Sequence, residues 1–232
     1  MNYAIIAAGE GSRLASEGVK YPKPLIPLNG VPIIERLIGI FMRCHAKSIS
    51  IITNSKQPKT VALLRKLQKD LPLNIVVKDT PSSMHSLYEL TPYLRNDRFC
   101  LTTVDTLFRE EEFKEYINTF IKSNNKGLMG VTDYIDDEKP LYVSTDNMMH
   151  ITGFHDTAPE HTRYISGGIY CLPPEALVTL ENCIKSGQSR MRNFQRQLII
   201  DNISLDAYPF GKIIDIDHAS DIEKAEKFIQ QI

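Results

Sequence analysis

The sequence predicts an α/β fold, a three-layer sandwich with a mostly parallel, mixed central sheet of the Rossmann-like kind. Short apolar runs alternate with segments of helical periodicity over the first half of the chain, which is the pattern of a parallel sheet covered on both faces. Short β-type runs separated by turn residues follow. A length of 232 residues and a hydrophobic content of 42% suit one large domain, which we expect to span residues 1–232.

The first half predicts β-α units in sequence. Strands are expected at residues 4–8, 48–53, 73–77 and 99–104. The helix after the first strand is expected to open at Pro32, because proline suits a first helical turn whose N–H groups lack partners. The side chain of Ser82 or Ser83 can cap a helix that carries Leu87, Leu90 and Leu94. Further helices are expected at residues 60–71 and 110–123.

The pattern changes after Gly127. Short β-type runs at residues 127–134, 141–144, 149–154 and 164–172 predict antiparallel or mixed strands over the C-terminal ends of the parallel sheet. Helices are expected again at 175–185 and 192–201, followed by a strand at 213–215. The last helix carries the sequence Ser220-Asp221-Ile222-Glu223, which has the form of a capping box.

Composition excludes several classes of protein. The formal net charge is −1, so we expect no nucleic-acid partner. No apolar run approaches the roughly 20 residues that cross a bilayer, and no signal peptide is recognisable, so we expect no membrane span and a cytoplasmic location. The four cysteines and six histidines show neither C-x-x-C nor zinc-hydrolase spacing, which predicts reduced thiols.

The first strand runs into a turn that contains Gly9, Gly11 and Arg13. Glycine lets backbone N–H groups approach a polyphosphate, and Arg13 and Lys23 can neutralise its charge. Leu14 stands where a dinucleotide fingerprint needs a third glycine, and a Walker A Gly-Lys-Ser/Thr is absent from the turn. The turn alone therefore leaves open a nucleotide site or a plain β-α turn that uses glycine for its geometry.

The wider pattern is more specific. Ala7-Ala8-Gly9-x-Gly11-x-Arg13-Leu14, followed by Lys23-Pro24-Leu25-x-Pro27-Leu28-x-Gly30, resembles the signature of the sugar-phosphate nucleotidyltransferase family, closely over the first forty residues and more loosely beyond. The resemblance implies the GT-A-like nucleotidyltransferase fold. It also implies transfer of a nucleoside monophosphate from a triphosphate to a sugar 1-phosphate or similar phosphate acceptor, with release of pyrophosphate.

The resemblance also implies roles for single residues. Arg13 would contact the phosphates, and Lys23 would stabilise charge around the reacting phosphorus. Nucleotide-binding roles are implied for Ala7, Ala8, Gly9, Gly11, Ser83 and Ser86. An acceptor-binding role is implied for Gly167 and Gly168, within a β-rich insertion around residues 127–172.

Two aspartates are candidate Mg²⁺ ligands. Asp105 follows an expected strand, and the carboxyl edge of an open α/β sheet is where ligands bind. In Asp215-Ile216-Asp217 the resemblance implies that Asp217 is the second ligand, with Asp215 in support, and Mg²⁺ prefers such hard oxygen donors. The alternatives are a turn or N-cap role for Asp105 and solvated aspartates at the end of the last strand.

Several alternatives stay open. The segment His85-Ser86-Leu87-Tyr88 resembles choline-phosphate cytidylyltransferase-like members, so CTP, UTP, dTTP and GTP all remain candidate donors. A cytidylyltransferase for phosphocholine or another phospho-alcohol is the main alternative. A molybdopterin guanylyltransferase-like role is compatible with the loop but less favoured, and Lys139 is expected to be a surface lysine rather than a catalytic one.

Two other classes of protein also remain open. One is a metal-dependent glycosyltransferase, and the other is a regulator that binds nucleotides or sugar phosphates without catalysis. We expect the partners to be a nucleoside triphosphate and a phosphorylated small molecule, with a homodimer possible.

Overall fold

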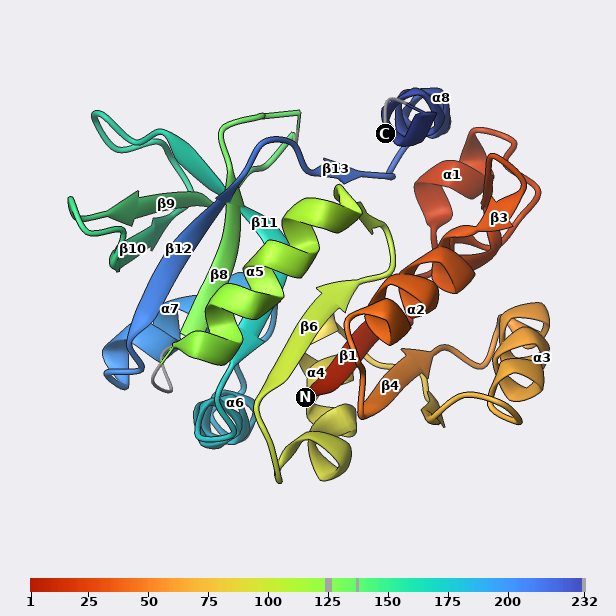
Figure 1. The fold of residues 1–232 in the computed structure, drawn as a ribbon, viewed down its shortest axis with the longest axis horizontal. Coiled ribbons are helices and arrows are strands. Elements are labelled where there is room, and N and C mark those ends of the chain that lie inside the picture. Colours follow the sequence, from red (N-terminus) through yellow and green to blue (C-terminus); the bar gives the residue numbers. More distant parts are fainter. Residues whose placement is uncertain (124–126, 137, 231–232) are drawn as a thin grey trace.

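A computed structural model describes residues 1–123, 127–136 and 138–230. Parallel strands form one half of its large sheet, and β1 lies between β4 and β6 (Figure 1). Every residue of β1 is buried, which explains its nearly unbroken apolar sequence. The strands of this parallel half are β1 (Asn2–Ala7), β4 (Ser48–Thr53), β5 (Leu73–Val77) and β6 (Phe99–Thr103).

The second half of the sheet is mixed. Strand β11 pairs antiparallel with β6 and carries the sheet onward, in the order β10-β9-β11-β6-β1-β4-β5, while β8 pairs with β11 and β12. This half comprises β8 (Gly127–Thr132), β9 (Tyr142–Thr145), β10 (Ile151–His155), β11 (Tyr164–Leu172) and β12 (Leu205–Phe210). The expected mixed, mostly parallel sheet is confirmed.

Strand β12 was not expected from the sequence. It contains Pro209, and proline argues against an interior strand because it cannot donate to the ladder. The structure resolves the conflict, because among the described strands β12 forms a ladder only with β8, apart from one bridge between Asp206 and His150, and Pro209 is exposed.

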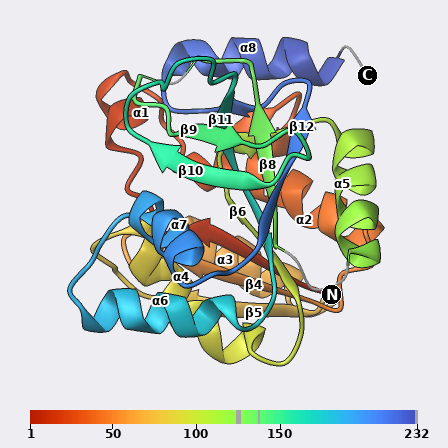
Figure 2. The same ribbon diagram turned by 90° about the vertical axis from the view of Figure 1, so that its left-hand side faces the viewer.

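Helices cover both faces of the sheet, which confirms the three-layer sandwich (Figures 1 and 2). Alternate residues of β1 face different layers, with Tyr3 and Ile5 in one core and Ala4 and Ile6 in the other. The first layer contains α2 (Ile33–Arg43), α3 (Pro58–Leu67), α5 (Glu110–Lys122) and α8 (Ala219–Gln230). The second contains α4 (Ser83–Leu94), α6 (Ala176–Lys185) and α7 (Met191–Ile200).

Short elements at the carboxyl edge of the parallel strands position the site. These are α1 (Ser12–Ser16), the 3₁₀ turn Lys23–Leu25 and the hairpin of β2 (Pro27–Leu28) and β3 (Val31–Pro32). Strand β7 (Thr106–Leu107) pairs with β13 (Ile214–Asp215), which brings the end of β6 beside the approach to α8.

The start of α8 differs from the expected capping box. The helix begins at Ala219, so Ser220 lies inside it rather than at its N-cap. The carboxylate of Asp221 instead accepts hydrogen bonds from the backbone N–H groups of His218 (2.8 Å) and Asp217 (3.2 Å). Among the helices that the structure describes, none has the length and apolar character needed to cross a membrane.

Candidate active site

The glycine turn after β1 forms one wall of a cavity of about 670 Å³. Gly11 has a φ of 64°, a left-handed conformation that favours glycine. A Cβ at Gly11 would lie 3.3 Å from the Cβ of Lys23, whereas a Cβ at Gly9 would have no atom within 4 Å. Gly11 therefore lets the segment carrying Lys23 pack against the turn, and Gly9 leaves the backbone open to the cavity.

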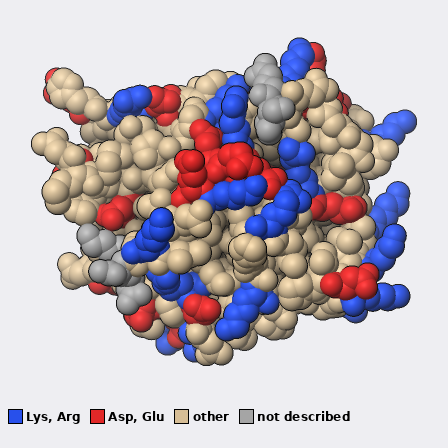
Figure 3. Space-filling view, in the orientation of Figure 1, with Lys and Arg blue, Asp and Glu red and all other residues tan. Residues whose placement is uncertain are grey.

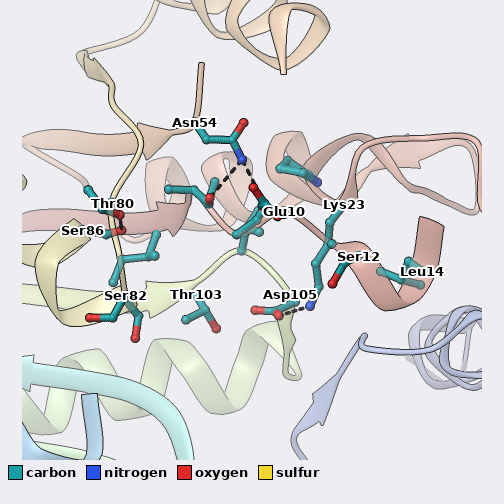
Figure 4. Close-up of a pocket in the computed structure, with 18 of the residues that line it drawn as sticks. Glu10, Ser12, Leu14, Lys23, Asn54, Thr80, Ser82, Ser86, Thr103 and Asp105 are labelled. Carbon is teal, nitrogen blue, oxygen red and sulfur yellow. Dashed lines mark hydrogen bonds and ion pairs between the residues drawn. The ribbon is translucent and has the colours of Figure 1, made fainter. Parts of the chain in front are cut away.

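Two buried amides hold this turn in place. The Asn54 amide donates to the carbonyl oxygens of Ala8 (3.0 Å) and Gly9 (3.3 Å), and the Gln57 amide donates to Gly9 (3.0 Å). Figure 4 shows Asn54 aimed at the turn. The sequence analysis missed both residues, although Asn54 directly follows an expected strand at the carboxyl edge, which is the signal that could have found it.

The same turn offers unused backbone donors. Within the described chain, the N–H groups of Gly9, Glu10 and Gly11 have no hydrogen-bond acceptor. Successive free N–H groups in a turn form a concavity that suits an anion. The carbonyl oxygens of Ala8 and Gly9 are engaged by Asn54 and Gln57, so the polarity of the turn favours negative charge in the cavity.

Lys23 lies at the centre of the charged groups. Its ammonium forms ion pairs with Asp105 and, at 2.7 Å, with Asp217, and only 11% of its side chain is exposed. Burial alone would lower the pKa of Lys23, but the two carboxylates outweigh it and raise that pKa. Lys23 is therefore a fixed cation, and it points toward Asp105 in Figure 4.

The chain brings the two aspartates together from distant positions. Asp105 follows β6, and the backbone N–H of Ile216 donates to its carbonyl oxygen at 3.3 Å. Asp217 also accepts a hydrogen bond from Arg13 at 3.1 Å. Asp217 therefore joins the glycine-turn side of the cavity to the Lys23 side.

Asp215 occupies a different environment from Asp217. It faces a neighbouring cavity of about 220 Å³, which Arg13 and Asp217 also line. The surrounding protein atoms, together with the nearby charges of Asp105 and Asp217, raise the pKa of Asp215 to about 7, although Asp215 is exposed at the cavity surface. This carboxyl group is poorly suited to holding a permanent charge without a cation beside it.

Most of the predicted site residues line the larger cavity. These are Ala7, Ala8, Gly9, Gly11, Arg13, Lys23, Ser83, Ser86, Asp105 and Asp217. Gly167 lines the smaller cavity, whereas Gly168 lines neither. The glycine pair sits at a register shift between β11 and β8, and a Cβ at Gly167 would lie 2.2 Å from Ile213, so close packing already requires a glycine there.

The start of α4 forms the opposite wall. Ser82 is the N-cap of α4, and its hydroxyl also lies 2.9 Å from the His85 ring. The hydroxyls of Thr80 and Ser86 are 2.6 Å apart. Asp79 accepts two hydrogen bonds from Ser55, so this wall is tied to the loop that follows β4.

A second set of contacts joins α1 to α8. Glu17 accepts hydrogen bonds from the His218 ring (2.6 Å) and from the backbone N–H of Ala219 (2.6 Å). The hydrogen bonds to Ala219 and His218 lower the pKa of Glu17. Glu138 lies 3.7 Å from His218 and 4.0 Å from Arg13. In this arrangement His218 holds the segment that carries Asp217.

The donor set fits a magnesium ion that is shared with a substrate. Mg²⁺ is bound through one or two carboxylates together with phosphates and water, rather than by an all-protein cage. Asp105 and Asp217 already share one cation, the Lys23 ammonium. Within the described ranges, no three His, Cys, Asp or Glu side chains are arranged to hold a metal by themselves. Any ion here would depend on substrate oxygens.

Comparison with known proteins identifies a family of nucleotide-using enzymes. Residues 3–197 match the family model described as the MobA-like NTP transferase domain. The chain is 25% identical over 207 residues to the bifunctional protein GlmU of Methanococcus vannielii, an alignment that covers 86% of this chain and 48% of that protein. The chain therefore spans about half the length of the curated relatives it matches.

Solved structures share the fold. The inositol-1-phosphate CTP transferase from T. maritima aligns with a TM-score of 0.81 and 17% identity, over 99% of this chain and 95% of that one. The CTP:phosphocholine cytidylyltransferase from Streptococcus pneumoniae aligns with a TM-score of 0.76 and 18% identity, over 98% of each chain. The family match and the shared architecture agree: the chain belongs to the family of MobA-like NTP transferase domains, which are nucleotidyltransferase enzymes.

Proposed function

We propose that this protein transfers a nucleoside monophosphate from a nucleoside triphosphate to a phosphorylated small molecule, in a Mg²⁺-dependent reaction that releases pyrophosphate. The observation that carries the proposal is the Lys23 ammonium between Asp105 and Asp217, in a cavity whose other wall is a turn with free N–H groups. A triphosphate would use both. The β- and γ-phosphates need donors such as the free N–H groups, and the α-phosphorus, several bonds away, needs a cation such as Lys23.

In this reaction an acceptor phosphate oxygen attacks the α-phosphorus. The bond from that phosphorus to the β-phosphate oxygen breaks, and pyrophosphate leaves with the electron pair. The free N–H groups of the glycine turn and the Arg13 guanidinium hold the β- and γ-phosphates. Lys23 stabilises the charge that develops on the α-phosphoryl oxygens. Holding both reactants in line supplies a large part of the rate enhancement, of the order of 7–11 kcal/mol in intramolecular models.

Asp105 and Asp217 would hold the metal ion. When bound, Mg²⁺ neutralises and orients phosphate oxygens. Without Mg²⁺, the two carboxylates would repel a polyphosphate. The positive charge of Lys23 would offset only part of that repulsion.

A sugar 1-phosphate is the acceptor we propose first, as the family resemblance implies. A phospho-alcohol with CTP as donor is the second candidate. It is favoured by the segment 85–88 at the start of α4, where Ser86 faces the cavity, and by two structural neighbours whose names include CTP.

A pyrophosphate-release assay tests the proposal. The protein is incubated with Mg²⁺, with each of CTP, UTP, dTTP and GTP, and with sugar 1-phosphates or phospho-alcohols. We expect release with one donor and only when an acceptor is present. Release of a nucleoside diphosphate from a nucleotide sugar would instead indicate a glycosyltransferase. Nucleotide binding without turnover across the panel would indicate a regulator, and either result would contradict the proposal.

A thermal-shift screen identifies the donor independently. A triphosphate at 100 times its dissociation constant adds roughly 2.7 kcal/mol to stability. We expect one of the four triphosphates to raise the melting temperature clearly more than the others in the presence of Mg²⁺.

A further inference from the structure

A second large cavity, of about 730 Å³, shares no lining residue with the glycine-turn cavity and has no role in the proposed reaction so far. It is bounded by α7, the residues after β10 and the segment before β9. We call it the arginine pocket. Among the residues that line it are Lys139, Asp156, Arg190, Arg192, Asn193 and Arg196.

Two of its arginines are held in fixed positions. Arg192 pairs with Asp156 and donates a further hydrogen bond to the carbonyl oxygen of Lys139 at 3.1 Å. Arg196 pairs with the other oxygen of Asp156 at 2.7 Å and donates to the carbonyl oxygen of Phe154 at 3.1 Å. The arginine side chains are only 29% and 31% exposed. Guanidinium groups anchored in this way lose little freedom when they bind a ligand.

The charge of the pocket favours an anion. One carboxylate, Asp156, serves two guanidinium groups, and both of its oxygens are engaged. The hydrogen bonds from Arg192 and Arg196 lower the pKa of Asp156, so it stays ionised and one positive charge remains in excess. The Arg190 side chain adds another, since it has no hydrogen-bond or ion-pair partner among the described residues.

The other acidic side chain of the pocket is directed elsewhere. Glu138 approaches Arg13 at 4.0 Å and His218 at 3.7 Å, on the side of the proposed reaction centre. An ammonium group entering the arginine pocket would therefore meet a carboxylate that is already neutralised, together with several cations. A carboxylate or a phosphate would meet guanidinium donors in place.

The arginine pocket adjoins the proposed reaction centre. Glu138 lines both the arginine pocket and the cavity of about 220 Å³, which in turn shares Arg13 and Asp217 with the glycine-turn cavity. The backbone N–H of Arg190 also lies 3.5 Å from the hydroxyl of Ser82, in the opposite wall of that cavity. Arg190 adopts a φ of 73°, a strained conformation for a residue with a side chain.

We propose that the arginine pocket is a subsite for the distal end of the acceptor, and that it selects acceptors carrying a second anionic group, a carboxylate or a phosphate, besides the reacting phosphate. This inference rests on the proposed function and narrows its substrate class. It separates such acceptors from neutral sugar phosphates and from phospho-alcohols with a cationic end.

Binding calorimetry on the full chain tests this with probes that differ only in the distal group. The pairs are glycerol 3-phosphate with 3-phosphoglycerate, and glucose 1-phosphate with glucuronic acid 1-phosphate, and glucose 1,6-bisphosphate supplies a distal phosphate. We expect a doubly anionic probe to bind about 10-fold tighter than its partner in at least one comparison, the scale of one charge-assisted hydrogen bond. The winning probe shows whether a carboxylate or a phosphate is preferred.

Variants assign the effect to the pocket. We expect Arg192→Gln and Arg196→Gln each to reduce this preference to about twofold or less, and Arg192→Lys to keep part of it because the charge remains. The matched control is Arg95→Gln, which removes an exposed arginine that pairs with Glu181 at 2.6 Å and lines none of the cavities described above. We expect it to leave the preference unchanged.

Equal affinities within every comparison, no measurable binding of any probe, or an unchanged preference in both glutamine variants would overturn the inference. A pyrophosphate-release assay with the same probes separates this failure from failure of the proposed function. Turnover with singly anionic acceptors and no preference would leave the function standing without the subsite. No release with any donor and acceptor would remove the function itself.

Discussion

The glycine-turn cavity, formed mainly by the N-terminal half of the molecule, and the arginine pocket, formed by the C-terminal half, are lined by different kinds of groups. The glycine-turn cavity uses backbone N–H groups, small side chains and a few charges at the ends of parallel strands. The arginine pocket uses long charged side chains from α7 and from segments around β9 and β10. Every nucleoside triphosphate has the same tail, which a backbone can bind, whereas side chains can be tuned to one acceptor.

Charged side chains of both signs are mixed on the surface. Figure 3 shows acidic and basic side chains intermingled on one face of the described molecule, with one acidic group bordered by basic residues. Because the protein is nearly neutral overall, we expect the local arrangement of charge, rather than net charge, to govern binding of the proposed anionic substrates.

The largest expected effect is on the N-terminal side. Asp105→Asn keeps the size of the side chain but removes the charge that faces Lys23 and the proposed metal. We expect kcat to fall about 100-fold or more, with the melting temperature nearly unchanged, as measured by pyrophosphate release and thermal unfolding. The control Asp97→Asn removes a surface carboxylate 3.8 Å from Lys47 and should retain activity. Near-normal turnover in Asp105→Asn would show that Asp105 is not a metal ligand.

Alanine substitutions at Gly11 and Gly18 distinguish the cost of backbone strain from the effect of moving Lys23. Gly11 and Gly18 both have positive φ, but only a Cβ at Gly11 meets another residue, Lys23 at 3.3 Å. Substitution by alanine should cost each about 1 kcal/mol of stability. We expect Gly11→Ala also to reduce kcat/KM about 10-fold by displacing Lys23, because catalysis is sensitive to small displacements of the groups that hold the reactants. Equal activity in Gly11→Ala and Gly18→Ala would refute the proposed role of this contact.

Asn54→Ala tests whether the glycine turn is held for the nucleotide. The variant removes the hydrogen bonds to the carbonyl oxygens of Ala8 and Gly9. We expect a loss of about 1–3 kcal/mol in stability and a higher KM for the triphosphate, with the KM for the acceptor little changed. Asn74→Ala, which removes a hydrogen bond to Ser50 at 3.2 Å, is the control and should leave both KM values unchanged.

The smallest expected effect comes from a surface ion pair away from both cavities. Arg43 donates to Glu110 at 2.6 and 2.7 Å, and these hydrogen bonds are the main cause that lowers the pKa of Glu110. A carboxyl whose pKa is lowered by folding stabilises the protein above its unfolded pKa of about 4.3 and loses that contribution as pH falls through the folded pKa.

Arg43→Gln should therefore lower the free energy of unfolding by about 0.5 kcal/mol at neutral pH. The difference from the unmodified protein should shrink as the pH falls below 4.3, and activity should not change. Denaturant unfolding at several pH values measures it. A difference that is independent of pH would mean that Arg43 acts through packing rather than charge.

The sequence was most informative where function depends on neighbouring residues in the chain. The strand, the glycine turn and Lys23 lie within the first 25 residues, so the sequence placed two cations near one candidate phosphate site, which the family resemblance then made specific. Asp105 and Asp217 are far apart in the sequence, and only the family resemblance linked them. The pairing of β7 with β13 supplies the physical link.

The arginine pocket could not be predicted in this way. Lys139, Asp156 and Arg192 come from separate segments, and their meeting depends on how α7 packs beside β10. Lys139 is exposed, as expected of a surface lysine, and it also lines this pocket, where its carbonyl oxygen accepts a hydrogen bond from Arg192. Gly168 was expected at the acceptor, but backbone geometry at the β11 register shift explains that glycine without a ligand.

A crystal structure with Mg²⁺ and the stabilising triphosphate tests the central claim most directly. The account predicts the β- and γ-phosphates against the N–H groups of Gly9 and Gly11, the α-phosphate beside Lys23, and the metal on Asp105 and Asp217. A triphosphate bound away from Lys23, or a metal held by neither aspartate, would contradict it.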